Sequence, residues 1–210
     1  MDTLADNPAA PPSGEAVVER VFEHRRVWRL TQDAFASAAA LIAGQEPAPE
    51  VVAGIARGGV PLARLLAAHY SVPAVELTAR HNRSDDVYLP ATGQVALPDE
   101  PDAALAAHRG ARVLLVDDIC GTGSTYRAAV PWLAAQLAPA AVRTAALCRS
   151  KAAAFTPDTW IWDMLDWVVF PWNEPVQTSE DLIVPAGPRV HPAPGPAPAH
   201  CLGDSPGARR

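Results

Sequence analysis

Apolar residues along this chain form short runs that alternate with longer segments of helical periodicity. The run at 111–119 is almost continuously apolar, which is typical of a strand buried on both faces. A further segment, TWIWDMLDWVVFPW (159–172), carries two short apolar runs near a chain turn. The predicted strands are HRRVWRL (24–30), EVVAGIA (50–56), AVELTA (74–79), ARVLLVDDI (111–119) and VRTAALCRS (142–150).

Three of the intervening segments are predicted to be helices: QDAFASAAALIA (32–43), VPLARLLAAHY (60–70) and GSTYRAAVPWLAAQL (123–137). Thr31 is a suitable N-cap for the first helix, and Gly44 is expected to end it. Pro131 predicts a kink or irregularity in the third, because proline lacks the N–H that an interior helical position needs.

Strands that alternate with helices predict an α/β fold, with a doubly wound, mainly parallel sheet covered by helices on both faces. Residues 80–110 are polar and proline-rich with weak periodicity, so we expect a long excursion there. Residues 1–14 and 185–210 are rich in proline, alanine and glycine. Such segments bury too little apolar surface to offset their ordering entropy, so we predict a folded domain over 15–184 between two disordered ends. The alternative for the C-terminal end is a strip that binds a partner.

Composition narrows the classes of function. The net charge of −6 argues against general nucleic-acid binding, although it leaves room for a small anionic ligand held by local N–H groups and arginines. No apolar run reaches the roughly 18 residues of a membrane span, and the N-terminus lacks the basic start and apolar stretch of a secretion signal. Three widely spaced cysteines form neither a disulfide framework nor a zinc pattern, so we expect a cytoplasmic protein.

Polar motifs follow three of the predicted strands: ARGG after residue 55, DDICGTGST after residue 116 and CRSK after residue 147. Ligands of open α/β sheets bind outside the carboxyl ends of the strands. The three motifs are therefore expected to meet in one active site.

The segment Gly121–Thr125 is rich in Gly, Thr and Ser and sits between a strand and a helix. Such a turn exposes backbone N–H groups, hydroxyl donors and the positive end of a helix, which together suit a phosphate. It lacks the lysine of the nucleotide-binding P-loop and is too short for a dinucleotide fingerprint, so a single phosphate monoester fits better.

Asp117 and Asp118 come just before this loop, where acids would repel a phosphate unless they contact something else. Carboxylates accept hydrogen bonds from sugar hydroxyls and can bind Mg²⁺ directly or through water. The stretch therefore suits a phosphorylated ribose. The plainer alternative is a strand end whose acids cap the following turn; a phospho-receiver domain also pairs acids, but in a different order along the chain.

These residues resemble a known family. VLLVDDICGTGST (113–125) resembles the phosphoribosyl-diphosphate (PRPP) motif of type I phosphoribosyltransferases, and GIARGGVPLARLLA (54–67) resembles the pyrophosphate-binding loop of that family. WVVFPWNEP (167–175) resembles the base-binding segment of its xanthine–guanine branch. The resemblance covers roughly residues 25–176 and implies the type I fold with a small base-binding hood, its base-binding segment at about 151–176.

The resemblance also implies roles for individual residues. Asp117 and Asp118 would contact the ribose hydroxyls and assist Mg²⁺, which sits mainly on PRPP itself. Arg57, Gly58 and Gly59 would present N–H groups to the pyrophosphate, in a loop that the family often builds with a cis non-proline peptide. The 5-phosphate would be held by Gly121, Thr122, Gly123, Ser124 and Thr125.

The excursion at 80–110 corresponds to the mobile lid of the family. Arg80 and Arg83 are candidate clamps for the pyrophosphate, and Tyr88 is a candidate lid aromatic. The alternative for each is an ordinary solvated side chain. A lid suits chemistry at an oxocarbenium-like centre because closure keeps water from replacing the base.

Lys151 is the single lysine in a chain with 16 arginines, which suggests a site that needs a compact donor. In the purine branch a lysine here donates to the O6 of the base. Trp167 would stack on the purine, and Val168 would offer backbone groups to its edge. The alternatives are a surface lysine and a core tryptophan; Trp172 is expected to pack structurally.

Two positions depart from the purine branch. Gly121 stands where the branch usually has an Asp proposed to handle the proton at N7, and Asn173 stands where it typically has an acid. The acceptor base is therefore open among hypoxanthine, xanthine and unusual heterocycles.

The leading hypothesis is a transferase that joins a purine-like base to PRPP. The alternatives are a phosphoribosyltransferase of specialised metabolism with a non-purine acceptor, and a regulatory protein that senses PRPP or nucleotides. Family resemblance further suggests a homodimer or homotetramer.

Overall fold

The structure is a computed structural model of the 210-residue chain that describes residues 27–79, 95–164, 166–173 and 182–193. Its centre is a six-stranded sheet in the order β3-β2-β4-β5-β6-β9. All neighbours in this sheet are parallel except β6 and β9, as the sequence predicted for a mainly parallel sheet. The strands are β2 (Val51–Ala56), β3 (Ala74–Thr78), β4 (Arg112–Cys120), β5 (Ala141–Ser150), β6 (Thr159–Met164) and β9 (His191–Pro192).

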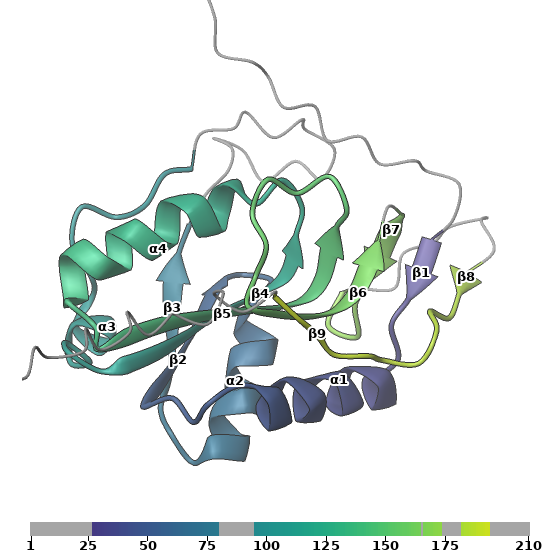
Figure 1. The fold of residues 1–210 in the computed structure, drawn as a ribbon, viewed down its shortest axis with the longest axis horizontal. Helices are drawn as coiled ribbons and strands as arrows, with labels where there is room; N and C mark the ends of the chain where they lie inside the picture. The colour runs from purple at the N-terminus through teal and green to yellow at the C-terminus, as the bar shows by residue number, and fades with distance from the viewer. Residues whose placement is uncertain (1–26, 80–94, 165, 174–181, 194–210) are drawn as a thin grey trace, which may run out of the picture.

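Helices cover both faces of this sheet (Figure 1). The helices α1 (Gln32–Gln45) and α2 (Val60–Tyr70) pack against one face and share a buried apolar cluster with it. The helices α3 (Ala103–Ala106) and α4 (Ser124–Leu137) close a second cluster with the other face. Thr31 caps α1 as predicted, accepting a hydrogen bond from the Ala34 N–H at 3.2 Å. Gly44 does not end α1, which runs through Gln45, and α4 continues through Pro131.

The chain reverses its direction of travel across the sheet between β2 and β4. From β2 it crosses through α2 to the edge strand β3, and it then returns to form β4 on the other side of β2. From β4 it crosses through α4, on the opposite face, to β5. The two crossovers therefore diverge at β2 and β4, and in open α/β sheets ligands bind in the crevice outside the carboxyl ends of the strands at such a point.

A second, three-stranded sheet forms a hood from segments far apart in the sequence. Its order is β7-β1-β8, built from β1 (Val27–Arg29), β7 (Trp167–Val169) and β8 (Leu182–Ile183), with both pairings parallel. The two apolar runs predicted within 159–172 are thus β6 of the main sheet and β7 of the hood.

Two predicted boundaries need correction. Residues 95–110 are part of the folded body, because Trp132 and Gln136 of α4 donate hydrogen bonds to the carbonyls of Pro98 and Asp99. Any lid is accordingly shorter than the expected 80–110, and residues 80–94 lie outside the described part. The prediction of a disordered tail from residue 185 is wrong for residues 185–193. There β9 pairs with β6, and the Trp162 indole donates to the Ala186 carbonyl at 2.8 Å.

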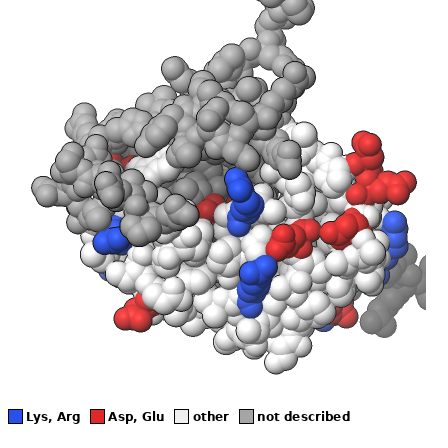
Figure 2. Space-filling model, turned by 180° about the vertical axis from the view of Figure 1, so that it is seen from behind, with Lys and Arg blue, Asp and Glu red and all other residues white. Residues whose placement is uncertain are grey.

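On the face shown in Figure 2, acidic and basic side chains of the described residues lie close to one another rather than in separate regions of one sign. Within the same part of the chain, no helix combines the length and apolar character needed to cross a bilayer.

Candidate active site

The turn between β2 and α2, residues 57–59, lies directly against the end of β4. A Cβ on Gly59 would stand 2.4 Å from the Val116 carbonyl oxygen, so only glycine fits there. The Gly59 N–H donates to the Ile55 carbonyl at 2.8 Å, so in this structure Gly59 shapes the turn and does not present its N–H outward. The Ala56–Arg57 peptide bond is cis, as the family resemblance implied.

Gly58 brings this turn into contact with the acid pair. A Cβ on Gly58 would lie 2.3–2.5 Å from the carboxylate atoms of Asp118, far inside van der Waals contact. The sequence suggested glycine here for the approach of a ligand. The structure adds a second reason, because Asp118 already occupies the space that a side chain at residue 58 would need.

The two acids differ in their surroundings. Asp117 is buried, with 8% of its surface exposed, whereas Asp118 is half-buried. The Asp117 carboxylate accepts a hydrogen bond from the Asp118 backbone N–H at 2.9 Å. Asp117 is thus fixed within the end of β4, and Asp118 lies nearer the crevice.

The predicted phosphate loop, Gly121–Thr125, lines a pocket with all of its residues except Ser124, together with Ile119, Cys120 and Tyr126. Gly123 has φ +84°, a left-handed conformation that favours glycine, and serves as the N-cap residue of α4. The Thr122 hydroxyl accepts from the Ser124 N–H at 3.2 Å and lies 2.9 Å from the Ser124 hydroxyl. The loop is therefore preorganised by its own hydroxyl groups.

The helices α2 and α4 both begin at this crevice. Neither helix has an acidic residue in its first turn or a side-chain cap, whereas α1 has Asp33 and the Thr31 cap. A helix N-terminus carries partial positive charge and unpaired N–H groups, which an anion can satisfy. The two helices are therefore suited to bind two anionic groups, one on each side of the acid pair.

Two neutral groups line the same region. Burial, reinforced by the negative charge of Asp117, raises the pKa of the Cys120 thiol to about 12. Burial, reinforced by the negative charges of Asp117 and Asp118, also raises the pKa of the Tyr126 phenol. The Tyr126 hydroxyl donates to the Ala145 carbonyl at 2.7 Å. Both groups stay protonated at neutral pH, so neither is suited to act as a general base.

The third predicted strand end lies against the phosphate loop. Lys151 is exposed just after β5, and the connection that it begins (151–158) contacts the loop at two points. The Ala154 N–H donates to the Thr122 carbonyl at 3.0 Å. Phe155 packs so closely that a Cβ on Gly123 would meet it at 2.5 Å, and its ring stacks on Tyr126 at a centroid distance of 5.1 Å. Phe155 was not predicted from the sequence, because it stands in a loop with no periodicity.

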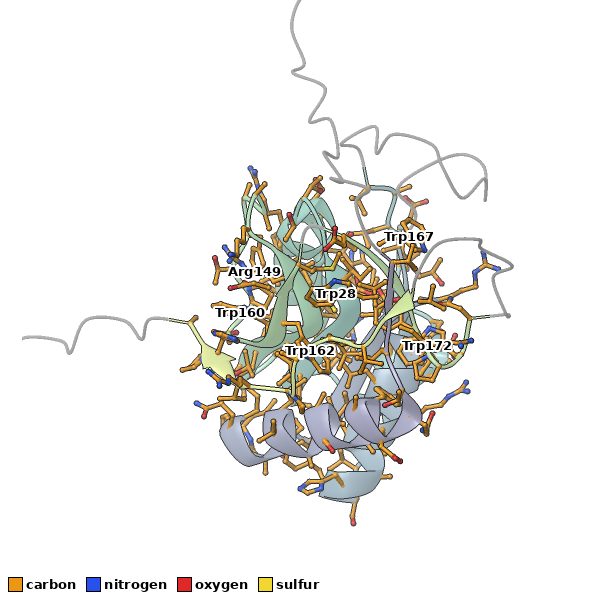
Figure 3. All side chains as sticks on the ribbon, turned by 90° about the vertical axis from the view of Figure 1, so that its right-hand side faces the viewer. Trp28, Arg149, Trp160, Trp162, Trp167 and Trp172 are labelled. Carbon is orange, nitrogen blue, oxygen red and sulfur yellow. The ribbon has the colours of Figure 1, made fainter. Side chains whose placement is uncertain are left out.

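The predicted base-binding residues lie in and beside the hood. Trp167 is half-buried in β7, and Val168 is buried next to it. Trp172 packs in the apolar body against Phe35 and Phe170, as expected for a structural residue. In Figure 3, Trp167 and Trp172 lie on one side of the molecule and Arg149 and Trp160 on the other.

Asn173 is exposed and closes the turn after β7. Its side-chain oxygen accepts a hydrogen bond from the Phe170 N–H at 2.6 Å. One lone pair of this oxygen is therefore engaged within the protein, which leaves a second lone pair and the amide NH₂ for other partners. The remaining candidates, Arg80, Arg83 and Tyr88, lie outside the described residues.

Carboxylates are the groups of the crevice that could hold Mg²⁺. No group of three or more His, Cys, Asp or Glu side chains is gathered for a metal within the described ranges. The carboxylates of Asp117 and Asp118 nevertheless fit Mg²⁺, which commonly binds one or two carboxylates and completes its shell with substrate phosphates and water. The residues suit a metal that arrives with its substrate.

Comparison with known proteins bears on this geometry. The sequence model of the phosphoribosyl transferase domain matches residues 19–179. The fold is similar to a purine phosphoribosyltransferase from Pyrococcus horikoshii Ot3, at 25% identity and a TM-score of 0.55, over 72% of this chain and 98% of that one. It is also similar to a xanthine-guanine-hypoxanthine phosphoribosyltransferase from Helicobacter pylori, at 19% identity and a TM-score of 0.57, over 70% and 93% of the two chains. No curated protein sequence matches the chain.

The family match covers well over half of the chain and includes both motifs that meet in the crevice. The α/β topology, the loop at the end of β2 and the acid pair at the end of β4 agree with it. The chain therefore belongs to the phosphoribosyl transferase domain family and is a PRPP-dependent phosphoribosyltransferase.

Proposed function

We propose that this enzyme joins a purine-like base to the ribose 5-phosphate of PRPP and releases pyrophosphate, with the help of Mg²⁺. The observation that supports this most directly is the contact between Gly58 and the Asp118 carboxylate. It brings the proposed pyrophosphate turn, the proposed ribose-binding acids and the start of the phosphate loop into one crevice. A ligand with a phosphate, a diol and a pyrophosphate in that order suits this arrangement.

Each part of PRPP has a matching group. The phosphate loop and the N-terminus of α4 hold the 5-phosphate, since they offer hydroxyls, N–H groups and positive charge. Asp117 and Asp118 accept hydrogen bonds from the ribose hydroxyls. The N–H groups of Arg57 and Gly58 and the N-terminus of α2 face the pyrophosphate, with Arg80 and Arg83 as further candidates.

The protein acts mainly by alignment and by stabilising charge. A base nitrogen that has given its proton to water attacks C1 of the ribose with inversion, the C1–O bond to pyrophosphate breaks, and the electron pair leaves with the pyrophosphate oxygen. The Arg57–Gly59 turn and the positive end of α2 stabilise this departing charge, which grows in the transition state. When bound, Mg²⁺ neutralises part of the pyrophosphate charge, and Asp117 and Asp118 are the residues that would hold it.

A purine-like acceptor is supported by the residues of the base segment and by the purine phosphoribosyltransferase from P. horikoshii to which the chain is similar. Lys151 donates to an exocyclic oxygen of the base. Trp167 stacks on its face, an interaction worth about 1–3 kcal/mol per base in nucleic-acid complexes. Val168 offers backbone groups to its edge.

The side chain at residue 173 narrows the choice of base. With one lone pair of its oxygen taken by the Phe170 N–H, Asn173 is a weaker acceptor for a 2-amino group than a carboxylate would be, and it adds an NH₂ donor that a carboxylate lacks. Gly121 supplies no carboxylate to take the N7 proton. Both features favour a base that carries an oxygen acceptor and loses its proton easily, such as a 2,6-dioxopurine or a comparable acidic heterocycle, over guanine.

A base panel tests the proposal. The chain is incubated with PRPP, Mg²⁺ and each of xanthine, hypoxanthine, guanine, adenine and acidic non-purine heterocycles, and pyrophosphate and nucleotide are quantified. We expect nucleotide from a 6-oxopurine, highest with xanthine, and none from the Asp117→Asn/Asp118→Asn variant. If none of the purines gave product, the proposed acceptor would be refuted. Undiminished turnover by the variant would refute the proposed site.

The same panel separates the alternative acceptor class. Turnover of a non-purine heterocycle alone would assign the chain to specialised metabolism, which the arrangement of Asn173 also permits. We further propose that the protein acts in the cytoplasm as a homodimer or homotetramer. Sedimentation of the purified chain tests the oligomeric state.

A further inference from the structure

A stack of three side chains at the edge of the main sheet lies outside the residues assigned to the reaction. The guanidinium carbon of Arg149 stands 5.0 Å from the centroid of the Trp160 ring, and Figure 3 shows the two side chains next to each other. The His191 imidazole stacks on Trp160 with a centroid distance of 5.4 Å and an interplanar angle of 12°. We propose that Arg149 is a positioning residue of the active site, held by Trp160 and by His191 of the C-terminal strand.

The stack is fixed from two directions. Asp163, on β6, accepts a hydrogen bond from the Trp160 indole at 3.0 Å and lies 3.7 Å from an Arg149 nitrogen. His191 is held in place by β9, which pairs antiparallel with β6 at Trp160. The orientation of Trp160 is thus set by its own strand and by the C-terminal segment together.

Arg149 extends from this stack to the connection that carries Lys151. Its guanidinium donates to the Thr156 hydroxyl at 3.2 Å, while its side chain is only 17% exposed. The Arg149 Nε–H is buried and has no hydrogen-bond partner among the described residues. Leaving a buried donor unsatisfied is unfavourable, so the planar group is placed by Trp160, Asp163 and Thr156 and not by a full set of hydrogen bonds.

The connection 151–158 in turn touches both halves of the proposed site. Its first residue is Lys151, the proposed donor to the base. Next to Thr156, Phe155 stacks on Tyr126 and fills the space beside Gly123. Its carbonyl also accepts from the Cys120 thiol at 3.6 Å, and Ala154 donates to Thr122. Loss of the Arg149 contact would therefore loosen the support of the phosphate loop and the base at once.

This inference rests on the proposed function, because a positioning role is expressed in substrate kinetics. Misplacement of groups around a reacting centre can reduce rates on the order of 10²-fold even when the change is remote. A residue that only stabilises the fold lowers the amount of active enzyme and leaves KM unchanged. A residue that positions the loop raises KM in the enzyme that remains folded.

The test compares Arg149→Met with Arg64→Met. The control makes the same change in an exposed ion pair between Arg64 of α2 and Glu76 of β3, whose side chains are 71% and 54% exposed. Amide hydrogen exchange follows the segment 151–158, where the Ala153 and Ala154 N–H groups are bonded. In Arg149→Met we expect exchange there to rise about tenfold or more, since the local opening free energy falls. KM for PRPP and for the base should rise by a similar factor, and Arg64→Met should change neither.

Two further variants sharpen the result. Arg149→Lys should restore little, because an ammonium lacks the planar fork that stacks on Trp160 and reaches Thr156. His191→Ala leaves every residue of β5 and of the connection intact, and we expect a smaller increase in exchange at 151–158. Unchanged exchange in His191→Ala would remove the C-terminal strand from the proposal.

Unchanged KM and unchanged exchange in Arg149→Met would overturn the positioning role of Arg149. A loss of Vmax that merely matches the loss of folded protein would overturn it as well. If the wild-type chain formed no product with any base, the proposed function would fail. The exchange arm would still decide whether Arg149 holds the connection against the phosphate loop.

Discussion

Gly58 shows how a single missing side chain shapes this crevice. The space beside its Cα is filled by the Asp118 carboxylate, with all three carboxylate atoms within 2.5 Å of where a Cβ would stand. A methyl group there must move either the turn after β2 or the acid. The need for glycine at residue 58 therefore couples the proposed pyrophosphate and ribose subsites.

Gly58→Ala should lower kcat/KM for PRPP by about 10²-fold, because Asp118 is displaced from its place beside the turn. Gly44→Ala on α1 is the matched control, since nothing lies within 4 Å of the Cβ that it adds. That control should keep full activity and gain up to about 1 kcal/mol of stability from the better helix propensity of alanine. Steady-state kinetics with urea unfolding of both variants checks the pair. Equal activity in the two alanine variants would show that the contact does not matter.

At this scale the motifs of the sequence supplied the candidate site residues, but the partners that these residues have in the structure were not predictable. The sequence motifs predicted that Asp118 and Gly58 lie near the same ligand. It gave no hint that the Gly59 N–H is taken by Ile55, or that the Asn173 oxygen is taken by Phe170. Such contacts depend on the precise path of a turn, which the kinds of residues along the chain do not encode.

At the scale of elements, a polar network joins the end of α1 to the starts of β5 and β6, far from the crevice. The Glu46 side chain is fully buried and accepts from Arg143 at 2.8 Å and 3.0 Å, and from the Thr159 hydroxyl. Arg143 also donates to Asp158 at 2.9 Å. A buried carboxylate needs such partners, so this network determines how α1 is placed on the sheet.

Arg143→Met should lower the free energy of unfolding by roughly 3 kcal/mol, because it leaves the Glu46 charge buried without its cation. The double variant Glu46→Leu/Arg143→Met removes both charges and should recover part of that loss. Urea unfolding of the wild type, both single variants and the double variant gives the coupling energy. Strictly additive losses would mean that the pair is not coupled. KM should stay at the wild-type value in the chains that fold.

Elements with a strong local signal were predictable, and those that depend on distant partners were not. The continuous apolar run of β4 and the Thr31 cap of α1 are explicit in the sequence. The strand β9 consists of a histidine and a proline in a proline-rich segment, and it exists only because β6 offers an open edge. Tertiary pairing of this kind overrides local propensity.

At the scale of the whole molecule, the C-terminal segment fastens the hood to the main sheet. From β8, paired with β1 in the hood, the chain passes Ala186, which accepts from the Trp162 indole of β6. It then forms β9, and the Ala193 N–H donates to the Asp158 carbonyl at 2.7 Å. Because these contacts join both sheets, we expect the described body to unfold as one cooperative unit.

Two buried thiols make the free energy of unfolding of this unit depend on pH. Burial raises the pKa of the Cys120 thiol to about 12, with Asp117 adding to the shift, and burial also raises the pKa of the Cys148 thiol. In the unfolded chain both thiols ionise near their ordinary value of about 8.5. Above that pH the unfolded chain binds fewer protons than the folded one, so the free energy of unfolding falls as pH rises towards the folded-state pKa values.

Between about pH 8 and about pH 9.5 each thiol should remove roughly 1 kcal/mol from the free energy of unfolding. This range ends below the ordinary pKa of tyrosine, so the buried Tyr126 phenol contributes little to the change. The variant Cys120→Ala/Cys148→Ala is the reference, since it keeps every other titrating group, Cys201 included. Truncating the two side chains lowers its stability at every pH, so the informative quantity is the change between the two pH values in urea unfolding. We expect the wild type to lose about 2 kcal/mol more than the variant over this range, and parallel losses would show that the thiols ionise as readily in the fold as outside it.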